Sequence, residues 1–199
     1  MEIEMKKIYD LMKKEWKDDM MHVHCPQSKA YVPMIEDERG VGSGMNAKLG
    51  DYDYITMISK EKYSGDVTIS ARFTFWGIAA PLLVISEDIN TNGKIPMLDL
   101  FFEVVAWRNG CNIWRLDSVP ENKVRPFKST KLLCNRFSVA EDTEHEMTVK
   151  ISGKTIEVWY AGQNFVLYNP DLPESFHVGF TACEGECRFT KFAIKKDEQ

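Results

Sequence analysis

The last third of the chain decides the fold. It contains the stretch EHEMTVKI at 144–151, then the turn Ser152-Gly153-Lys154, then the stretch TIEVWYAG at 155–162. After a proline-containing segment come FHVGFTA at 176–182 and CRFTKFAIK at 187–195. Hydrophobic and polar residues alternate along much of these stretches, which is the two-residue period of strands that bury one face. We therefore expect a succession of antiparallel β-strands joined by short polar turns.

The same period is found upstream, in the segment 66–76. One face of this segment is apolar and consists of Val67, Ile69, Ala71, Phe73 and Phe75. The other face is polar with an aromatic end, and consists of Asp66, Thr68, Ser70, Arg72, Thr74 and Trp76. Such a pattern is typical of an antiparallel strand with one face in the core and one in solvent.

Residues 98–107 alternate in a similar way. One row consists of Leu100, Phe102, Val104 and Ala106, and the other of Asp99, Phe101, Glu103, Val105 and Trp107. The sequence Arg108-Asn109-Gly110 follows, and an Asn-Gly pair in a short connection predicts a tight hairpin. We expect residues 111–116 to form the returning strand.

The N-terminal segment has a different period. Ile8, Leu11, Met12 and Trp16 fall at helical spacing, with Lys and Glu between them. Residues 3–19 therefore predict a short amphipathic helix that packs against the strands, which we place within residues 1–20.

Three segments predict loops. Residues 36–50 are rich in turn-forming residues. Residues 86–97 and 117–130 are polar and contain proline. Long loops on a rigid sandwich often border a binding site.

The size and composition of the chain suit an all-β domain. A single domain spanning 1–199 with its sandwich core at 52–196 is the simplest interpretation of 199 residues. A hydrophobic content of 44%, with 12% aromatic residues, is enough to fill a sizeable core.

Charge and apolar runs limit the partners. The formal net charge is -5 and no long basic run appears, so we do not expect nucleic acid as a partner. The longest apolar run, 76–85, contains Gly77 and Pro81 and is too short to span a membrane. No signal-peptide pattern follows the N-terminal lysines, which predicts a cytoplasmic protein without a membrane partner. The sequence does not indicate an oligomeric state.

Metal and cofactor signals are weak. The five cysteines are odd in number and scattered, which favours reduced thiols. Cys183 and Cys187 flank an expected hairpin loop but lack a second ligand pair, and His22 and His24 share a strand face without an identifiable third ligand. No phosphate-binding loop or nucleophile elbow is present, so we expect neither a metal nor a cofactor.

The pattern from Asp66 onward resembles the concanavalin A-like lectin/glucanase jelly roll, including uncharacterised bacterial members. Residues 65–73 resemble its early core strand and 102–105 its mid-chain strand. Residues 145–163 are similar to its hairpin, and 178–181 with 189–194 to its closing strands. The resemblance covers about two-thirds of the chain and rests on packing and turn residues, which report fold rather than activity.

The resemblance implies an all-β jelly-roll sandwich of two curved antiparallel sheets. The family includes sugar-binding lectins, galectin-like domains and family-16 glycoside hydrolases, and its concave sheet usually carries the carbohydrate site. It therefore implies a carbohydrate- or glycoside-binding domain. Two alternatives stay open: a carbohydrate-active enzyme, either a glycoside hydrolase or a lyase, and a non-catalytic interaction domain.

Within such a fold, polar and aromatic residues that alternate with core residues are the candidates for ligand binding. Aromatic rings stack on sugar faces, and planar polar groups make paired hydrogen bonds to hydroxyls. The candidates for substrate binding are Arg72, Trp76, Trp107, Asn112 and Trp114. Alternation alone leaves a second possibility, in which Trp107 and Trp114 are packing residues, because one β-bulge reverses the two faces.

Glu103 is the candidate catalytic residue, as an acid or base. Family-16 hydrolases carry a Glu-x-Asp-x-(x)-Glu motif on one strand, whereas this chain has Asp99 and Glu103 with Phe101 between them. Positions four apart on a strand are about 13 Å apart. The carboxyl groups of a retaining pair are only about 5 Å apart. We therefore expect Glu103 to bind a hydroxyl rather than to perform family-16 chemistry.

Overall fold

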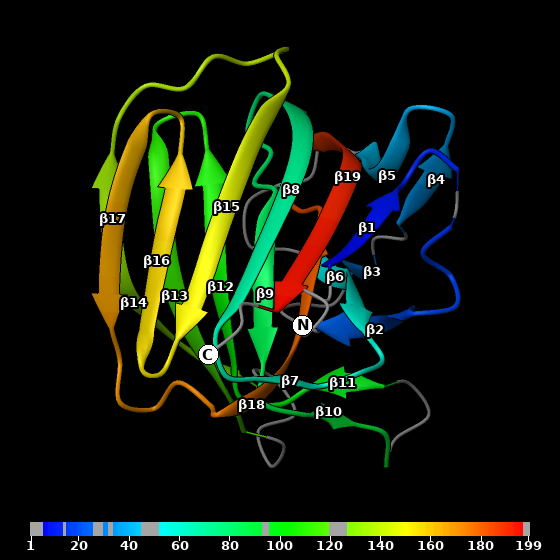
Figure 1. Ribbon diagram of the computed structural model, residues 1–199. Coiled ribbons are helices and arrows are strands. Elements are labelled where there is room, and N and C mark those ends of the chain that lie inside the picture. The colour runs from blue at the N-terminus through cyan, green and yellow to red at the C-terminus, as the bar shows by residue number, and fades with distance from the viewer. Residues whose placement is uncertain are drawn as a thin grey trace.

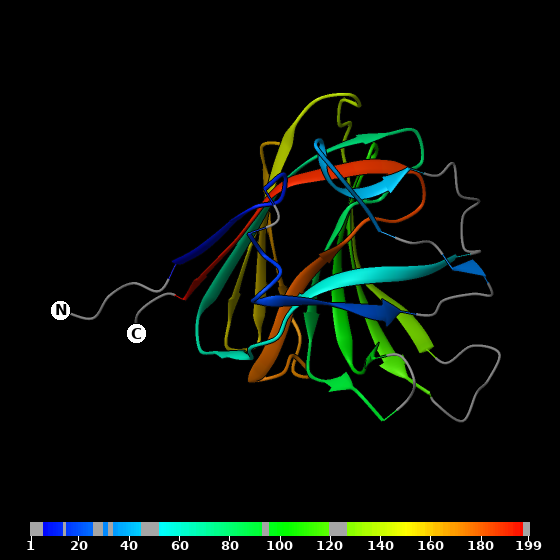
Figure 2. The same ribbon diagram turned by 90° about the vertical axis from the view of Figure 1, so that its right-hand side faces the viewer.

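Two β-sheets packed face to face make up the structure, a computed structural model (Figure 1). It describes residues 6–13, 15–25, 30–31, 34–44, 52–92, 96–119 and 127–196. All strand pairs are antiparallel except β11 with β2 and β3 with β6. In Figure 2 the sheet that contains β19 and β1 lies apart from the sheet that contains β2, β6 and β18.

The first sheet has eight strands among the described residues. Their order is β17 (Gln163–Tyr168), β16 (Thr155–Tyr160), β15 (His145–Ser152), β8 (Val67–Trp76), β19 (Glu186–Lys196), β5 (Gly40–Gly44) and β4 (Ile35–Asp37), and β1 (Lys6–Asp10) also pairs with β19. Three of the strands predicted in the last third of the chain, 144–151, 155–162 and 187–195, correspond to β15, β16 and β19 of this sheet, whereas 176–182 belongs to the other sheet. β17 was not predicted as a strand.

The second sheet has eleven strands within the same described ranges. Their order is β10 (Ile89–Asn90), β11 (Met97–Leu98), β2 (Met20–Cys25), β6 (Tyr52–Ser59), β18 (Ser175–Thr181), β9 (Leu82–Ser86), β12 (Phe101–Trp107), β13 (Gly110–Ser118) and β14 (Phe127–Arg136). The short strands β3 (Ala30–Tyr31) and β7 (Tyr63–Ser64) pair with β6 and β18.

The core lies between the two sheets and confirms the predicted alternation. The apolar row of β8 is at most 1% exposed, and Phe102, Val104 and Ala106 of β12 are completely buried in the same core. Phe73 on β8 lies 5.4 Å from Phe189 on β19, centroid to centroid, and Phe189 lies 4.6 Å from Phe180 on β18. These rings join the two sheets.

The predicted hairpin at Arg108-Asn109-Gly110 is confirmed. It joins β12 to β13, with Trp107 paired to Gly110. Gly110 has a φ of 142°, and a Cβ at this position would lie 2.0 Å from the carbonyl oxygen of Asn135 on β14. Only glycine fits so close to the neighbouring strand.

The predicted N-terminal helix is wrong. Residues 6–10 form β1, and the described residues between 11 and 19 form turns. Tyr9, Leu11 and Trp16 are buried, whereas Ile8 and Met12 are 49% and 48% exposed. Backbone pairing with β19 and stacking of Tyr9 on Phe192 outweigh the helical spacing, because helix propensity is weak compared with tertiary contacts.

The predicted loops are partly strands. Residues 36–50 contain β4 and β5, residues 86–97 contain β10, and β14 begins at Phe127. The segment around Cys183 is not a hairpin, because it connects β18 of the second sheet to β19 of the first. The described residues include no helix of the length and apolar character that a membrane crossing requires.

Candidate functional site

A cavity of about 540 Å³ lies on the outer face of the second sheet. Its floor comes from β9, β12, β13 and β14, and its wall from the connections at 77–80 and 183–184. The alternation that buries Phe102 and Val104 in the core turns Glu103, Val105 and Trp107 to this outer face.

Cross-strand pairing arranges the floor in rows. Glu103 on β12 pairs with Trp114 on β13, which pairs with Lys131 on β14. Trp107 pairs with Gly110, which pairs with Arg136. Neighbouring strands are about 4.8 Å apart, so each row of three spans about 10 Å.

A β-bulge on β14 decides which side chains face the cavity. Ile113 pairs with Leu133, but the next residue, Trp114, pairs with Lys131, which leaves Leu132 as the extra residue. Because of this shift, both Lys131 and Cys134 line the cavity although they are three positions apart.

Two connections meet at the wall. The amide of Ala80 donates a hydrogen bond of 2.8 Å to the carbonyl oxygen of Cys183. A Cβ on Gly185, whose φ is 137°, would lie 2.8 Å from the backbone nitrogen of Ala79, so this close approach requires glycine. Glu184, which also lines the cavity, has a φ of 57°, a left-handed conformation that is uncommon for glutamate.

Glu103 is a buried carboxyl group in the floor. Glu103 is only 7% exposed, and none of the described residues forms a hydrogen bond or ion pair with its carboxyl group. Burial, with a smaller contribution from the charge of Glu184, raises the pKa of Glu103 to about 8. At neutral pH the group is therefore mostly protonated and can donate a hydrogen bond.

Two further polar atoms of the floor have no partner among the described residues. They are the indole Nε1 of Trp107 and the side-chain oxygen of Asn112, and both are buried. A buried polar atom without a hydrogen bond costs about 1–3 kcal/mol. One donor and one acceptor at the cavity therefore stand to gain hydrogen bonds from a ligand.

Trp114 has a different environment. The ammonium Nζ of Lys131 lies 4.6 Å from the centroid of its ring. This is a cation–π contact, so Trp114 supports Lys131 in addition to lining the cavity.

Comparison with known proteins identifies the fold. No family model matches the chain, and a search of curated proteins finds no match. Solved structures do match. The carbohydrate binding module CBM66 from Bacillus subtilis has a TM-score of 0.60 at 9% identity, covering 83% of this chain and 92% of the module. The fold is a jelly-roll β-sandwich.

Two enzymes share this jelly roll. A β-agarase A structure in complex with oligoagarose has a TM-score of 0.59 at 8% identity, covering 85% of this chain and 78% of the enzyme. LamA from Z. galactanivorans, in complex with laminaritriose and laminaritetraose, has a TM-score of 0.55 at 7% identity. The match covers 90% of this chain and 93% of LamA. At such identities the likeness shows the fold alone, as the resemblance noted in the sequence implied.

The jelly roll brings four of the six candidate residues together. Glu103, Trp107, Asn112 and Trp114 all line the cavity, because the hairpin of β12 and β13 turns them to one face. Asp99 precedes β12, is exposed and does not line the cavity, so the broken acidic motif supplies a single carboxyl group.

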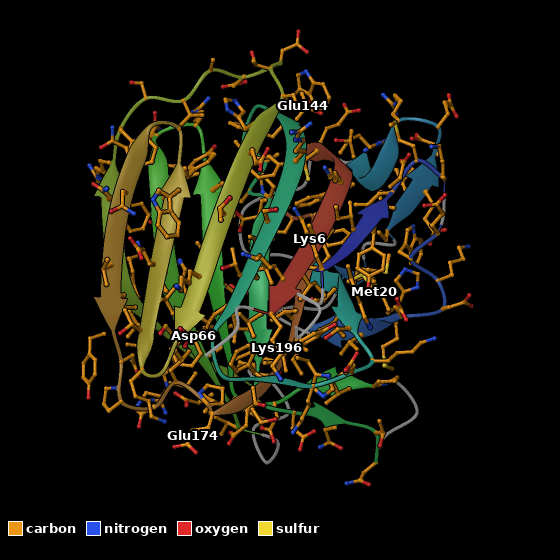
Figure 3. All side chains as sticks on the ribbon, in the orientation of Figure 1. Lys6, Met20, Asp66, Glu144, Glu174 and Lys196 are labelled. Atoms are coloured by element: carbon orange, nitrogen blue, oxygen red, sulfur yellow. The ribbon has the colours of Figure 1, made fainter. Side chains whose placement is uncertain are left out.

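The other two candidates, Arg72 and Trp76, lie on β8 of the first sheet. Figure 3 looks onto the outer face of that sheet, with Asp66 just before β8 and Glu144 just before β15. Arg72 Nε donates a 2.9 Å hydrogen bond to Glu146, and Trp76 Nε1 donates one of 2.8 Å to Asp142. Neither residue lines the cavity, although Trp76 directly precedes Gly77 at the cavity wall.

Several cavity residues were missed in the sequence. Lys131 and Arg136 belong to β14, whose alternation is interrupted by the bulge, and Glu184 comes from a connection between sheets. Of these elements, only β14 could have been predicted from the sequence, as a further strand that pairs with β13 and has polar residues on one face.

The metal and thiol candidates stay apart. Within the described ranges, no three His, Cys, Asp or Glu side chains gather as metal ligands. His22 Nε2 lies 3.4 Å from an oxygen of Glu36, while Cys183 and Cys187 are buried and not joined by a disulfide.

Proposed function

We propose that the cavity on the second sheet binds an oligosaccharide. The observation that carries this proposal is the convergence of two tryptophans with the unpaired polar atoms of Trp107 and Asn112 in one cavity. The carbohydrate binding module and the two oligosaccharide-bound enzymes described above use the same fold, which supports the choice of ligand class.

Each residue has a role suited to its chemistry. Trp107 Nε1 donates to a sugar oxygen, and the Asn112 side-chain oxygen accepts from a hydroxyl. The protonated carboxyl group of Glu103 donates a third hydrogen bond. Val105 and the indole rings contact the apolar C–H faces of the sugar.

Calorimetric titration with a panel of oligosaccharides tests the proposal. Trp107→Ala and Asn112→Ala should each weaken binding about 5- to 30-fold, since one lost buried hydrogen bond or aromatic contact is worth about 1–2 kcal/mol. The control is Trp159→Ala, which removes an exposed tryptophan on the other sheet and should leave affinity unchanged. Unchanged affinity in both cavity variants would contradict the site.

A second function, glycoside cleavage by hydrolysis or elimination, is favoured by one observation. A carboxyl group with a pKa of about 8 is protonated at neutral pH, as a general acid must be. Glu184, near enough to raise that pKa, supplies a second carboxylate at the wall. The test is Glu103→Gln assayed on a substrate that the wild type cleaves. Turnover should be lost while binding is retained, and intact turnover would remove Glu103 from this role.

A further inference from the structure

We infer that the ligand of this cavity is an anionic oligosaccharide, whose carboxylate or sulfate groups are bound by Lys131 and Arg136 on β14. This inference rests on the proposed function and specifies its ligand. It comes from two cations of the cavity, Arg136 and Lys131, that have no carboxylate within ion-pair distance among the described residues.

Arg136 is exceptional among the arginines that the structure describes. The other five each have a carboxylate within ion-pair distance: Arg39, Arg72, Arg108, Arg115 and Arg188. Arg136 lines the cavity and has no such partner among the described residues. In a chain with a net charge of -5, an arginine that faces a cavity without a carboxylate marks a place where an anion fits.

Lys131 is the second cation, and Trp114 holds it in place. Its Nζ lies 4.6 Å from the Trp114 ring centroid, and none of the described carboxylates lies within ion-pair distance. Contact with the ring fixes the ammonium group at the cavity and leaves its hydrogen atoms available to an anion.

The acidic residues of the cavity do not cancel these charges. Glu103 is mostly protonated at neutral pH because burial raises its pKa to about 8. Arg108 at the cavity is paired with Glu141, so Glu184 of the wall stands against Lys131 and Arg136. The cavity is therefore positive although the chain as a whole is negative.

The two cations come from positions that are well separated along the strands. Lys131 lies opposite Trp114 and Arg136 opposite Gly110, and these β13 residues are four positions apart. Four strand residues span about 13 Å between backbone positions. This spacing suits a ligand with two anionic groups, such as an oligosaccharide with a charge on more than one sugar. Carboxylates and sulfate esters share this chemistry, and the planar guanidinium of Arg136 suits either.

The experiment compares oligosaccharides of equal length: an uncharged glucan, an oligouronate and a sulfated galactan. We expect at least one acidic ligand to bind about tenfold or more tightly than the glucan at about 0.05 M salt. The advantage should shrink at about 0.5 M salt, because exposed charges are screened. The uronate and sulfate arms identify which group is recognised.

Variants locate the effect. Lys131→Gln and Arg136→Gln should each remove most of the preference for the acidic ligand while leaving the weaker binding of the glucan. Both side chains are exposed, so the variants should fold normally. The control, Arg72→Gln on the other sheet, should keep the preference. Equal binding of neutral and acidic ligands would overturn this inference and leave the proposed function standing. Binding of none of the three ligands would overturn both.

Discussion

The two outer faces of the sandwich have opposite characters. On the first sheet the polar side chains are satisfied by neighbours on the same face, as in the pair of Arg72 with Glu146, and Trp159 is 39% exposed. On the second sheet an apolar cluster with Val84, Phe101 and Leu116 is buried, and next to it lies a cavity with an unpaired carboxyl group. The first face is suited to solvent, and the second to a ligand.

This difference shows what strand alternation can and cannot tell. β8 alternates between buried and more exposed residues along its whole length, whereas β12 is buried on both faces and its non-core row also contains Phe101 and Val105. Both strands have tryptophan at the end of the non-core row. Only the neighbouring strands decide whether that row meets solvent or a cavity. The following predictions compare the two faces, beginning with the largest expected effect.

Replacing an aromatic residue on each face should give the largest difference between the two faces, measured as the loss of unfolding free energy. Phe101 is completely buried on the outer face of the second sheet, with Phe127 5.4 Å away, centroid to centroid. Phe101→Ala should lower the free energy of unfolding by about 3–5 kcal/mol. Trp159→Ala on the first sheet should lower it by less than about 1 kcal/mol. Urea unfolding measures both, and equal losses would contradict the assigned burial.

The carboxyl groups of the two faces should differ in their effect on pH-dependent stability. Because the pKa of Glu103 rises from 4.5 to about 8 on folding, the protein loses stability as pH rises through that interval. The full difference corresponds to at most about 5 kcal/mol. Glu103→Gln should remove this loss and be more stable than wild type at pH 9.

The matched variant for this prediction is Glu146→Gln on the first sheet. Its ion pair with Arg72 is exposed and contributes little to stability, so no comparable gain should occur at pH 9. Chemical unfolding at several pH values measures both variants. A Glu103→Gln curve parallel to that of wild type would show that Glu103 is ionised in the folded protein.

The smallest effect is expected from the ion pair itself. A double-mutant cycle with Arg72→Ala and Glu146→Ala should give a coupling energy close to zero, since both side chains are nearly half exposed. The coupling should fall further at high salt. A coupling as large as that of a buried ion pair would mean that this face is far less solvated than its exposure indicates.

Much of the fold could be predicted from local patterns. The alternation from Val67 to Trp76 and the Asn109-Gly110 turn are properties of a few consecutive residues, and the structure confirms both. The N-terminal segment could not be predicted in this way. Its residues 8, 11, 12 and 16 fit a helix, but pairing of β1 with β19 is a contact between opposite ends of the chain.

The candidate site was predictable only within one hairpin. The positions of Glu103, Trp107 and Trp114 follow from β12, β13 and the turn between them. Lys131 depends on a bulge, and Glu184 depends on the crossing between sheets, neither of which leaves a local signal. Arg72 was grouped with these residues because alternation shows which residues of a strand share a face, but it does not show which sheet the strand belongs to.

The five tryptophans of the chain allow the most direct test of the central claim, that the second sheet carries the ligand site. In a two-dimensional ¹H–¹⁵N spectrum each indole Nε1 gives one resonance, assigned by single substitutions and followed during titration with an oligosaccharide that binds. We predict that the resonances of Trp107 and Trp114 shift, while those of Trp16, Trp76 and Trp159 do not. Shifts of Trp76 or Trp159, with Trp107 and Trp114 unchanged, would place binding on the first sheet and contradict this account.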